Sequence, residues 1–447
     1  MNSLIMSMSG TRGVVGGTLT PQIALNTGLA FGSLWKTGTV VVGGDTRTSH
    51  DTYKSAVIAG LLAAGVDVID IGRVPTPTVQ QMIHRFNAVA GVVVTASHNP
   101  VIWNGLKLMN GSGSFLDDAE YAQFKTIYDT QTWTVGGWDS QGKLSVDPTA
   151  MESHVDKILQ LIDCSAIRNA GLRVVIDANH GAGAVSDSVL LDRLGVKYDI
   201  LNAEPTGRFA HDPEPLEKNL SQIKETLAAG GYDIGFVQDA DADRLVILDE
   251  KGRFIGEDYS LAFCVDHILT IEKEVSPTVV VNLSTSRILE WVAAQHGGTT
   301  LYTKIGESHV TQGIKSNHAV VGGEGNGGVI YPRIGWGRDS LVGIVVALAH
   351  LAAKKKTVSE IVSTYPQYAM IRDKIAVGSQ AEVTHAITEI RNRFSQFPQN
   401  ELDGVKVTLP NGWIHVRPSN TESIVRIFVE GDTLSLAQDL MKKAQLS

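Results

Sequence analysis

One pattern of segments occurs three times along the chain and limits the folds that the chain can adopt. Each copy has an apolar run rich in β-branched residues, a polar loop, a helical stretch and a second apolar run. The copies begin at VVVGG (40–44), RVVID (173–177) and TVVVN (278–282), so they are spaced by roughly a hundred residues. Continuous apolar runs that alternate with helices are typical of α/β domains, whose mostly parallel sheets are covered on both faces.

The pattern predicts particular strands and helices in each copy. The first copy contains a strand from residue 39, a helix over 51–64 and a strand over 66–71. The second contains a strand over 173–177, a helix that ends at 194 and a strand over 196–201. The third contains a strand over 278–282, a helix that ends at 295 and a strand over 299–303. We therefore expect three similar α/β domains with mixed, mostly parallel sheets.

The last part of the chain follows a different pattern. From about residue 369 we expect a strand, a helix over 381–394, strands over 404–409, 413–416 and 424–430, and a helix from 433. This order favours a smaller α+β domain built from hairpins. The predicted domains are residues 1–148, 149–254, 255–366 and 367–447, and the predicted linkers lie within 133–148, 252–258 and 365–367.

Charge and composition exclude several classes of protein. A net charge of −9 argues against a nucleic-acid-binding protein that depends on a basic surface. The two cysteines, Cys164 and Cys264, lie far apart and form neither a disulfide framework nor a zinc motif. The amino-terminal segment lacks a basic region followed by an apolar run, and we find no apolar stretch of membrane-spanning length. We therefore expect a cytoplasmic protein without nucleic-acid or membrane partners.

The stretch VVVTASHNP (92–100) predicts a buried strand that delivers a serine to a loop. Ser97 is a candidate nucleophile, and His98 is a possible partner. Serine, asparagine and proline are also ordinary turn residues, and most such loops carry no chemistry. On its own, this loop favours a simple turn.

Three aspartates alternate with alanines in DADADR (239–244), between the apolar runs 234–237 and 245–248. In an extended segment, Asp239, Asp241 and Asp243 point to one side, and a hard cation would relieve their repulsion. A calcium-binding helix–loop–helix site is excluded, because Arg244 stands where that loop needs glycine. Magnesium fits better than calcium, and the apolar flanks make an acidic surface turn the weaker alternative.

Two further motifs suit a sugar phosphate. GGEGNGG (322–328) lets backbone approach a ligand and offers Glu324 and Asn326 to hydroxyl groups. RPSNTES (417–423) combines an arginine, whose guanidinium can donate two hydrogen bonds to one phosphate, with short polar side chains that also donate. This is the composition of a phosphate site. Weaker candidates are Arg12, Lys107, Lys304 and His309. A single lysine or histidine in such a place is more often a structural or surface residue than a catalyst.

The motifs TASHNP, DADADR, GGEGNGG and RPSNTE, one in each predicted domain, resemble those of the α-D-phosphohexomutase superfamily. The resemblance covers essentially the whole chain. It implies four domains around one cleft and reversible phosphate transfer between C1 and C6 of a hexose. It also implies Mg²⁺, a phosphoserine and a hexose 1,6-bisphosphate intermediate.

The resemblance also implies a role for each candidate residue. Ser97 would carry the phosphate, and it would bind the magnesium together with Asp239, Asp241 and Asp243. The catalytic neighbours of the phosphate and of the reacting hydroxyl would be Arg12, His98, Lys107, Arg244 and His309. The residues that bind the sugar and its second phosphate would be Lys304, Glu324, Asn326, Arg417, Ser419, Asn420 and Thr421.

One motif departs from the pattern of the superfamily. Many relatives end the sugar loop in Ser-Gly-His, whereas this chain has Asn326 followed by two glycines, so a histidine with a possible acid/base role is absent. Proton transfer would then fall to Lys107, His309 or His98.

The sequence leaves the substrate and the rival functions open. The resemblance favours glucosamine phosphate as substrate, with mannose or glucose phosphate as the alternative. A magnesium-dependent phosphatase that works through a phosphoserine would share Ser97 and the aspartates, and a non-enzymatic binding module would leave Ser97 unphosphorylated. A monomer and a homodimer are both compatible with the sequence.

Overall fold

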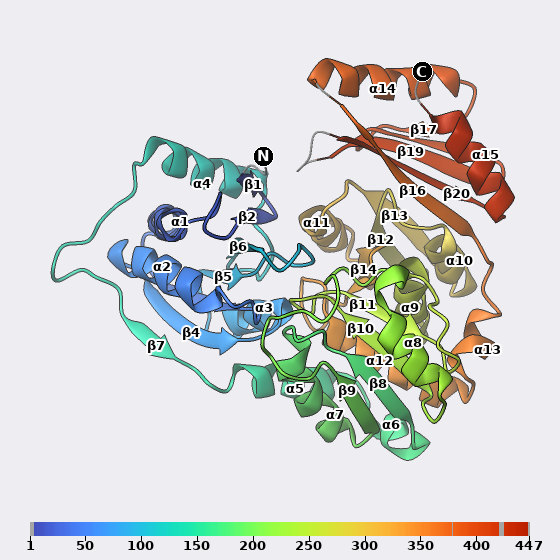
Figure 1. Ribbon diagram of the computed structural model, residues 1–447, viewed down its shortest axis with the longest axis horizontal. Coiled ribbons are helices and arrows are strands. Elements are labelled where there is room, and N and C mark those ends of the chain that lie inside the picture. The colour runs from blue at the N-terminus through green and yellow to red at the C-terminus, as the bar shows by residue number, and fades with distance from the viewer. Residues whose placement is uncertain (1–3, 378, 420–423, 446–447) are drawn as a thin grey trace. The chain divides into compact units, whose positions relative to one another are not determined.

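The computed structural model describes residues 4–377, 379–419 and 424–445. The chain divides into two compact units, and the elements are drawn in Figure 1. The first unit comprises Met1–Ile268 and Asn326–Val362, and the second comprises Leu269–Gly325 and Ser363–Ser447.

The first unit contains a seven-stranded mixed sheet. The strand order is β1 (Ile5–Ser7), β2 (Gly10–Val14), β6 (Trp103–Asn110), β5 (Ala90–Val94), β3 (Thr39–Gly44), β4 (Asp67–Arg73) and β7 (Leu144–Val146). Neighbouring strands pair antiparallel from β1 to β5 and parallel from β5 to β7. The expected mixed sheet is confirmed, and β7 lies within the stretch 133–148 that was expected to be a linker.

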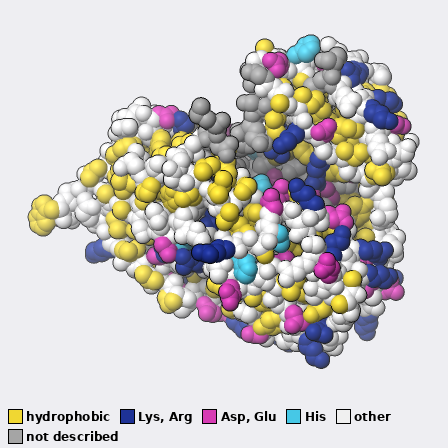
Figure 2. All heavy atoms as spheres, in the orientation of Figure 1, with side chains coloured by type: hydrophobic (Ala, Val, Ile, Leu, Met, Phe, Trp, Pro, Cys, Tyr) yellow, Lys and Arg dark blue, Asp and Glu magenta, His cyan; other side chains and the backbone are white. Residues whose placement is uncertain are grey.

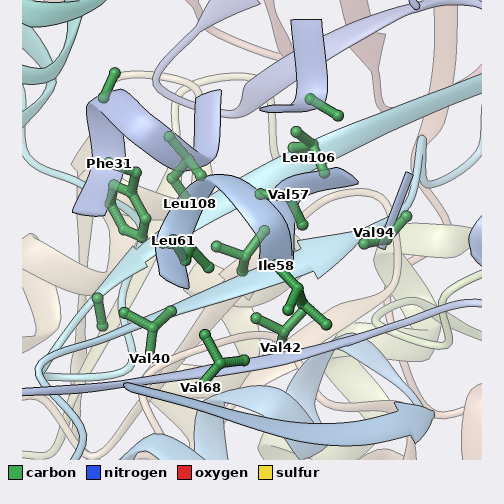
Figure 3. Close-up of a cluster of buried hydrophobic side chains, with 14 of the residues drawn as sticks. Phe31, Val40, Val42, Val57, Ile58, Leu61, Val68, Val94, Leu106 and Leu108 are labelled. Atoms are coloured by element: carbon green, nitrogen blue, oxygen red, sulfur yellow. The ribbon is translucent and has the colours of Figure 1, made fainter. Parts of the chain in front are cut away.

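Helices cover both faces of this sheet, as the apolar strands predict. Val92 and Val94 pack in a core with α1 (Pro21–Trp35), α2 (His50–Ala63) and α4 (Asp118–Thr130), and Figure 3 shows part of that core. Val93, which points the other way along the same strand, packs with α3 (Thr76–Arg85) and α5 (Ala150–Leu161). Strand β5 is therefore buried on both sides and holds the start of the serine loop firmly.

Local signals explain where several helices begin. Thr20 accepts a hydrogen bond from the backbone N–H of Ile23, and proline occupies the first turn of α1. Asp117 and Glu120 form a capping box at the start of α4. Asp339 caps α12 (Ser340–Lys354) by accepting hydrogen bonds from two backbone N–H groups.

The first unit also contains a four-stranded sheet in the order β11 (Leu245–Leu248), β10 (Ile234–Gln238), β8 (Arg173–Asp177) and β9 (Lys197–Leu201). β10 and β11 pair antiparallel, and the other pairs are parallel. The accompanying helices are α6 (Ser165–Ala170), α7 (Gly183–Leu194), the 3₁₀ turn η1 (Glu217–Asn219) and α8 (Ser221–Ala228). Helix α9 (Glu257–Glu272) follows along the chain and runs past the end of the first unit's long segment at Ile268. Strand β15 (Gly328–Ile330) and helix α13 (Val358–Val362) belong to the first unit's second segment.

In the second unit, β12 (Thr278–Asn282) lies between β13 (Thr299–Thr303) and β14 (Val321–Glu324) and is parallel to both. Helices α10 (Ile288–Gln295) and α11 (Glu307–Asn317) connect these strands. The predicted third copy of the repeat is thus confirmed.

The carboxy-terminal part is the expected smaller α+β domain. Its antiparallel sheet has the order β16 (Ala369–Ala376), β20 (Ile424–Gly431), β19 (Gly412–Pro418), β18 (Val405–Leu409) and β17 (Gln399–Asn400). Residues of α14 (Gln380–Arg393) and α15 (Leu434–Ala444) pack in one core with this sheet. The limits of the four predicted domains stay predictions.

Charged side chains of both signs are interspersed on the face that Figure 2 shows. Among the residues that the structure describes, no helix is both long and apolar enough to cross a bilayer.

Replacing Phe31 by alanine should destabilise the first sheet and its helices. The Phe31 ring is fully buried and makes edge-on contacts with Trp35 and Phe124, so Phe31→Ala should lower the free energy of unfolding by about 3–5 kcal/mol. Urea unfolding followed by circular dichroism measures this change. Val146→Ala, at a side chain that is 70% exposed, is the control and should change stability by at most about 0.5 kcal/mol. Equal midpoints for the two variants would contradict this account of the core.

Candidate active site

The loop after β5 presents Ser97 to the acidic turn of the neighbouring sheet. Ser97 is 2% exposed and has a φ of +51°, a left-handed conformation that is uncommon for a residue other than glycine. Its Oγ donates a hydrogen bond to Asp239 Oδ2 at 3.1 Å and lies 3.4 Å from His98 Nδ1. The predicted strand and loop are confirmed, and the serine hydroxyl points at carboxylates.

The acidic segment between β10 and β11 is a turn, and not the extended stretch that the sequence alternation predicts. Ala242 has a φ of +52°, and its N–H donates to Asp239 O at 3.0 Å. Asp239 Oδ1 accepts from the backbone N–H groups of Asp243 and Arg244, each at 3.1 Å. The turn gathers one carboxylate oxygen from each aspartate within 4.8 Å, and all three aspartates, including Asp241, are fully buried.

Two cationic side chains contact the triad directly. Lys107 on β6 is 1% exposed, and its Nζ lies 2.5 Å from Asp241 Oδ2 and 2.9 Å from Asp243 Oδ2. Arg338, which precedes α12, donates to Asp243 Oδ2 at 3.0 Å. Sequence reasoning identified Lys107 but missed Arg338, although an arginine in the glycine-rich GWGRDS stretch was a detectable signal.

Burial and these charges shift the ionisation of the triad. Burial, together with Asp243 and Asp241, raises the pKa of Asp239 well above its ordinary value. Burial alone would raise the pKa of Asp243, but Arg338 and Lys107 outweigh it and hold the pKa below its ordinary value. Burial would lower the pKa of Lys107, but Asp241 and Asp243 outweigh it and raise the pKa. Lys107 is therefore charged, and negative charge is least compensated at Asp239.

The triad fits a hard divalent cation. Asp241 Oδ1 and Asp243 Oδ1 are buried, and neither accepts a hydrogen bond from the described residues. A buried carboxylate oxygen without a partner carries a desolvation cost that a cation would remove. Three monodentate carboxylate oxygens also match the preference of magnesium and leave coordination positions open. The residues present can thus hold a metal ion.

Two arginines flank the serine loop. Arg244 Nη2 lies 2.8 Å from His98 Nδ1, and because a guanidinium only donates, Nδ1 accepts and the ring proton resides on Nε2. Burial, Arg244 and Arg12 lower the pKa of His98 well below its ordinary value, so the ring is neutral. Arg12 on β2 donates to Asn99 Oδ1 at 3.2 Å. The structure therefore brings together five predicted residues around the triad, namely Arg12, Ser97, His98, Lys107 and Arg244.

Asn326 lies at the start of a tight loop that packs on β11. Leu245 N donates to Gly327 O at 3.4 Å, and a side chain at Gly327, whose φ is +88°, would meet Leu245 O at 2.2 Å. Only glycine fits this approach. The loop with Asn326 is thereby held next to the residue that follows Arg244.

In the second unit, Glu324 is held beside the loop that precedes α11. Its Oε1 accepts from Asn282 Nδ2 at 3.0 Å and from Gly306 N at 3.2 Å, and the residue is 6% exposed. The same loop carries Lys304, which is exposed, and His309 lies in the first turn of α11.

Arg417 at the end of β19 connects to that loop through an aspartate. Arg417 Nε lies 3.1 Å from Asp403 Oδ1, and Asp403 Oδ2 accepts from Ile305 N at 3.0 Å. Ser419 N donates to Ile424 O at 2.9 Å. Asn420 and Thr421 lie outside the described residues.

Thr76 is a further residue of the site that sequence reasoning missed. At the start of α3, its Oγ1 donates to Asp241 Oδ2 at 2.5 Å, and its N–H donates to Asp241 O at 2.9 Å. The two residues are 165 positions apart, so no local pattern could have paired them.

Four models of one protein family match the chain in succession. They are those for phosphoglucomutase/phosphomannomutase alpha/beta/alpha domains I (residues 4–134), II (152–252) and III (256–368) and for the C-terminal domain (372–445).

Individual relatives match nearly the whole chain. A phosphoglucomutase/phosphomannomutase of Thermococcus kodakarensis is 36% identical over 440 residues, which cover 97% of this chain and 96% of the relative. A probable phosphoglucosamine mutase of Methanopyrus kandleri is 36% identical over 434 residues, with 97% and 95% covered. The crystal structure of a phosphoglucomutase/phosphomannomutase family protein from Burkholderia thailandensis is similar, with a TM-score of 0.86, 26% identity and 98% and 97% coverage.

Magnesium should stabilise the protein through the triad. A ligand at about 100 times its dissociation constant adds about 2.7 kcal/mol to stability, so MgCl₂ should raise the melting temperature at constant ionic strength. Asp241→Asn should abolish most of this shift, because it replaces a buried carboxylate that lacks a partner at Oδ1. Asp192→Asn, at an exposed position on α7, is the control and should keep the full shift. An unchanged shift in Asp241→Asn would remove the triad as the metal site.

Proposed function

Since the chain belongs to the phosphoglucomutase/phosphomannomutase family, it is a phosphohexomutase and therefore an isomerase, and we propose that it transfers phosphate through Ser97. The observation that carries the proposal is the buried Ser97 hydroxyl, which lies 3.1 Å from a carboxylate of an acidic triad. We also propose the four domain limits predicted from the sequence and a cytoplasmic location.

The surroundings of Ser97 favour phosphoryl transfer over acyl transfer. A serine that attacks a carbonyl needs a neighbouring base to take its proton. His98 Nδ1 is 3.4 Å from Ser97 Oγ, but it already accepts from Arg244. Two arginines, by contrast, suit a phosphoryl group, whose charge they can neutralise.

Charge balance supports a divalent cation beside a phosphorylated serine. The three aspartates are matched by three cationic side chains, Lys107, Arg244 and Arg338. A phosphoryl group on Ser97 would add a charge of about −1.5 to −2, and Arg12, the other arginine beside the serine loop, would match only part of it. Mg²⁺ held by Asp239, Asp241, Asp243 and the phosphate on Ser97 would supply the missing positive charge during phosphoryl transfer.

The proposed reaction has two transfers. In the first, the P–O bond to Ser97 Oγ breaks, the hexose phosphate hydroxyl forms the new P–O bond, and the hydroxyl proton replaces the phosphoryl group on Ser97. The product is a hexose 1,6-bisphosphate, which reorients and returns its other phosphate to Ser97. Arg12 and Arg244 hold the transferring group, and His98 keeps Arg244 oriented. Because His98 Nδ1 is occupied, we assign proton transfer to His309 and to Lys107, which is charged and would therefore act as the proton donor.

The side chains that hold the sugar are also part of the proposal. We propose that Glu324, Lys304 and Asn326 contact sugar hydroxyls. Glu324 is buried and is fixed at the loop that also carries Lys304, and Asn326 comes from the first unit. We assign the phosphate that does not react to Arg417, Ser419, Asn420 and Thr421.

The proposed preferred substrate is glucosamine phosphate, interconverted between its 6-phosphate and 1-phosphate. The relative from Methanopyrus kandleri bears the name of that activity, whereas the relative from Thermococcus kodakarensis is named for glucose and mannose phosphates. Phosphomannomutase or phosphoglucomutase activity is therefore the alternative.

Ser97→Ala should remove nearly all mutase activity and leave the fold intact, because no other group can take the phosphate at this position. Intact mass of the purified wild-type protein should show one added phosphate that Ser97→Ala lacks. Ser140→Ala, at an exposed serine, is the control and should retain both the phosphate and the turnover. A Ser97→Ala variant that keeps most of its turnover would refute the relay, and release of inorganic phosphate by the wild type would favour a phosphatase.

Turnover compared across glucosamine, mannose and glucose 1-phosphates, with a trace of the matching bisphosphate, tests the substrate. We expect the largest kcat/KM for glucosamine 1-phosphate. A larger value for mannose or glucose 1-phosphate would reverse the assignment within the family.

A further inference from the structure

Arg47, in the loop after β3, is buried with every donor of its side chain occupied. It is 1% exposed, and a guanidinium has five N–H donors. Four of the five acceptors are backbone carbonyls of the segment that carries Ser97. The acceptors are Ser97 O at 2.7 Å, Asn99 O at 2.6 Å, Pro100 O at 2.9 Å, Trp103 O at 2.8 Å and Asp45 Oδ2 at 3.2 Å.

Asp45 connects the same side chain to the amide of Ser97. Its Oδ1 accepts from Arg47 N at 3.0 Å, and its Oδ2 accepts from Thr95 Oγ1 at 2.5 Å. Thr95 Oγ1 in turn accepts from Ser97 N at 2.8 Å. Arg47 therefore holds the carbonyl of Ser97 directly, while Asp45 and Thr95 hold its N–H.

These contacts act on a residue whose backbone is strained. Ser97 has a φ of +51°, which costs free energy for a residue with a Cβ atom and persists only where the surroundings enforce it. The same conformation directs Ser97 Oγ toward Asp239. A relaxed loop would turn the hydroxyl away from the triad.

Arg47 also contacts the part of the chain that carries the acidic turn. Its guanidinium lies over the ring of Phe209, 4.9 Å from the ring centroid. The neighbouring Thr46 Oγ1 donates to His180 O at 2.7 Å. Both contacts join the loop after β3 to the segment between β8 and β10, so Arg47, which binds the serine loop, is itself fixed relative to the sheet that bears the triad.

We propose that Arg47 is a positioning residue for phosphoryl transfer: it holds Ser97 in the left-handed conformation that directs Oγ at the acidic triad. The inference rests on the proposed function of Ser97. No sequence motif assigned this role to Arg47, and none of its donors is left over for substrate. Its effect must therefore be exerted through Ser97.

A positioning role and a purely structural role predict different kinetics. A misplacement of about 1 Å at a reacting atom costs about 100-fold in rate. Arg47→Lys keeps the charge, but its ammonium has three donors and cannot serve five acceptors. We expect kcat to fall about 100-fold, with a KM for hexose phosphate within about threefold of the wild type, because the sugar contacts lie elsewhere.

The experiment compares Arg47→Lys with Arg73→Lys, a matched control at an arginine whose side chain is 40% exposed and pairs with Asp51. Steady-state kinetics and the single-turnover transfer from phosphorylated enzyme are measured, with circular dichroism to confirm folding. Arg73→Lys should keep the wild-type kcat. A folded Arg47→Lys variant with wild-type kcat and transfer rate overturns the proposal.

Thr95→Val extends the test in case Arg47→Lys does not fold. It removes the acceptor for Ser97 N at nearly constant volume and leaves Arg47 in place, so kcat should fall about 10-fold or more with little change in KM. Unchanged kcat in folded Thr95→Val overturns the proposal. If wild type and Arg73→Lys carry no phosphate on Ser97 and isomerise no substrate, the proposed function itself fails. If wild type and Arg73→Lys are active, and the folded Arg47 and Thr95 variants have the same kcat as these two proteins, only the positioning role fails.

Discussion

Three buried carboxylates within 4.8 Å of one another are the arrangement on which the rest of the site depends. Burial and mutual repulsion oppose their ionisation, so positive charge must be brought to them from other parts of the chain. Lys107 from β6 and Arg338 from the segment before α12 supply part of that charge. Since buried ion pairs are seldom a source of stability, such a cluster is better explained by binding and chemistry than by folding.

The serine loop and the acidic turn face each other with strained backbones. Ser97 and Ala242 both have left-handed φ angles although neither is glycine. Local strain of this kind persists when the surrounding structure over-determines it, and here hydrogen bonds to Arg47 and to the carboxylate of Asp239 do so. The hydroxyl and the carboxylates are therefore placed before substrate binds, which reduces the reorganisation that the reaction requires.

Much of this molecule follows from local sequence patterns. The strands at 173–177 and 278–282 occupy the predicted residues, and the helices of the repeat end within one residue of the expected positions. Hydrophobic runs and caps act over a few residues, so they can be read directly along the chain. The prediction of an extended segment at 239–244 was wrong. The alternation of aspartate and alanine does not reveal a turn that the Asp239 carboxylate stabilises by accepting backbone hydrogen bonds.

The sequence by itself determined the type and order of the elements and the chemical character of the candidate residues, because periodicity and residue chemistry are local properties. Only the tertiary structure decided which charges meet. Lys107 and Asp241 are 134 positions apart, and Arg338 and Asp243 are 95 apart, so their pairing depends on how two sheets pack. The same holds for Arg47, because its four backbone acceptors lie 50 to 56 positions away in the sequence.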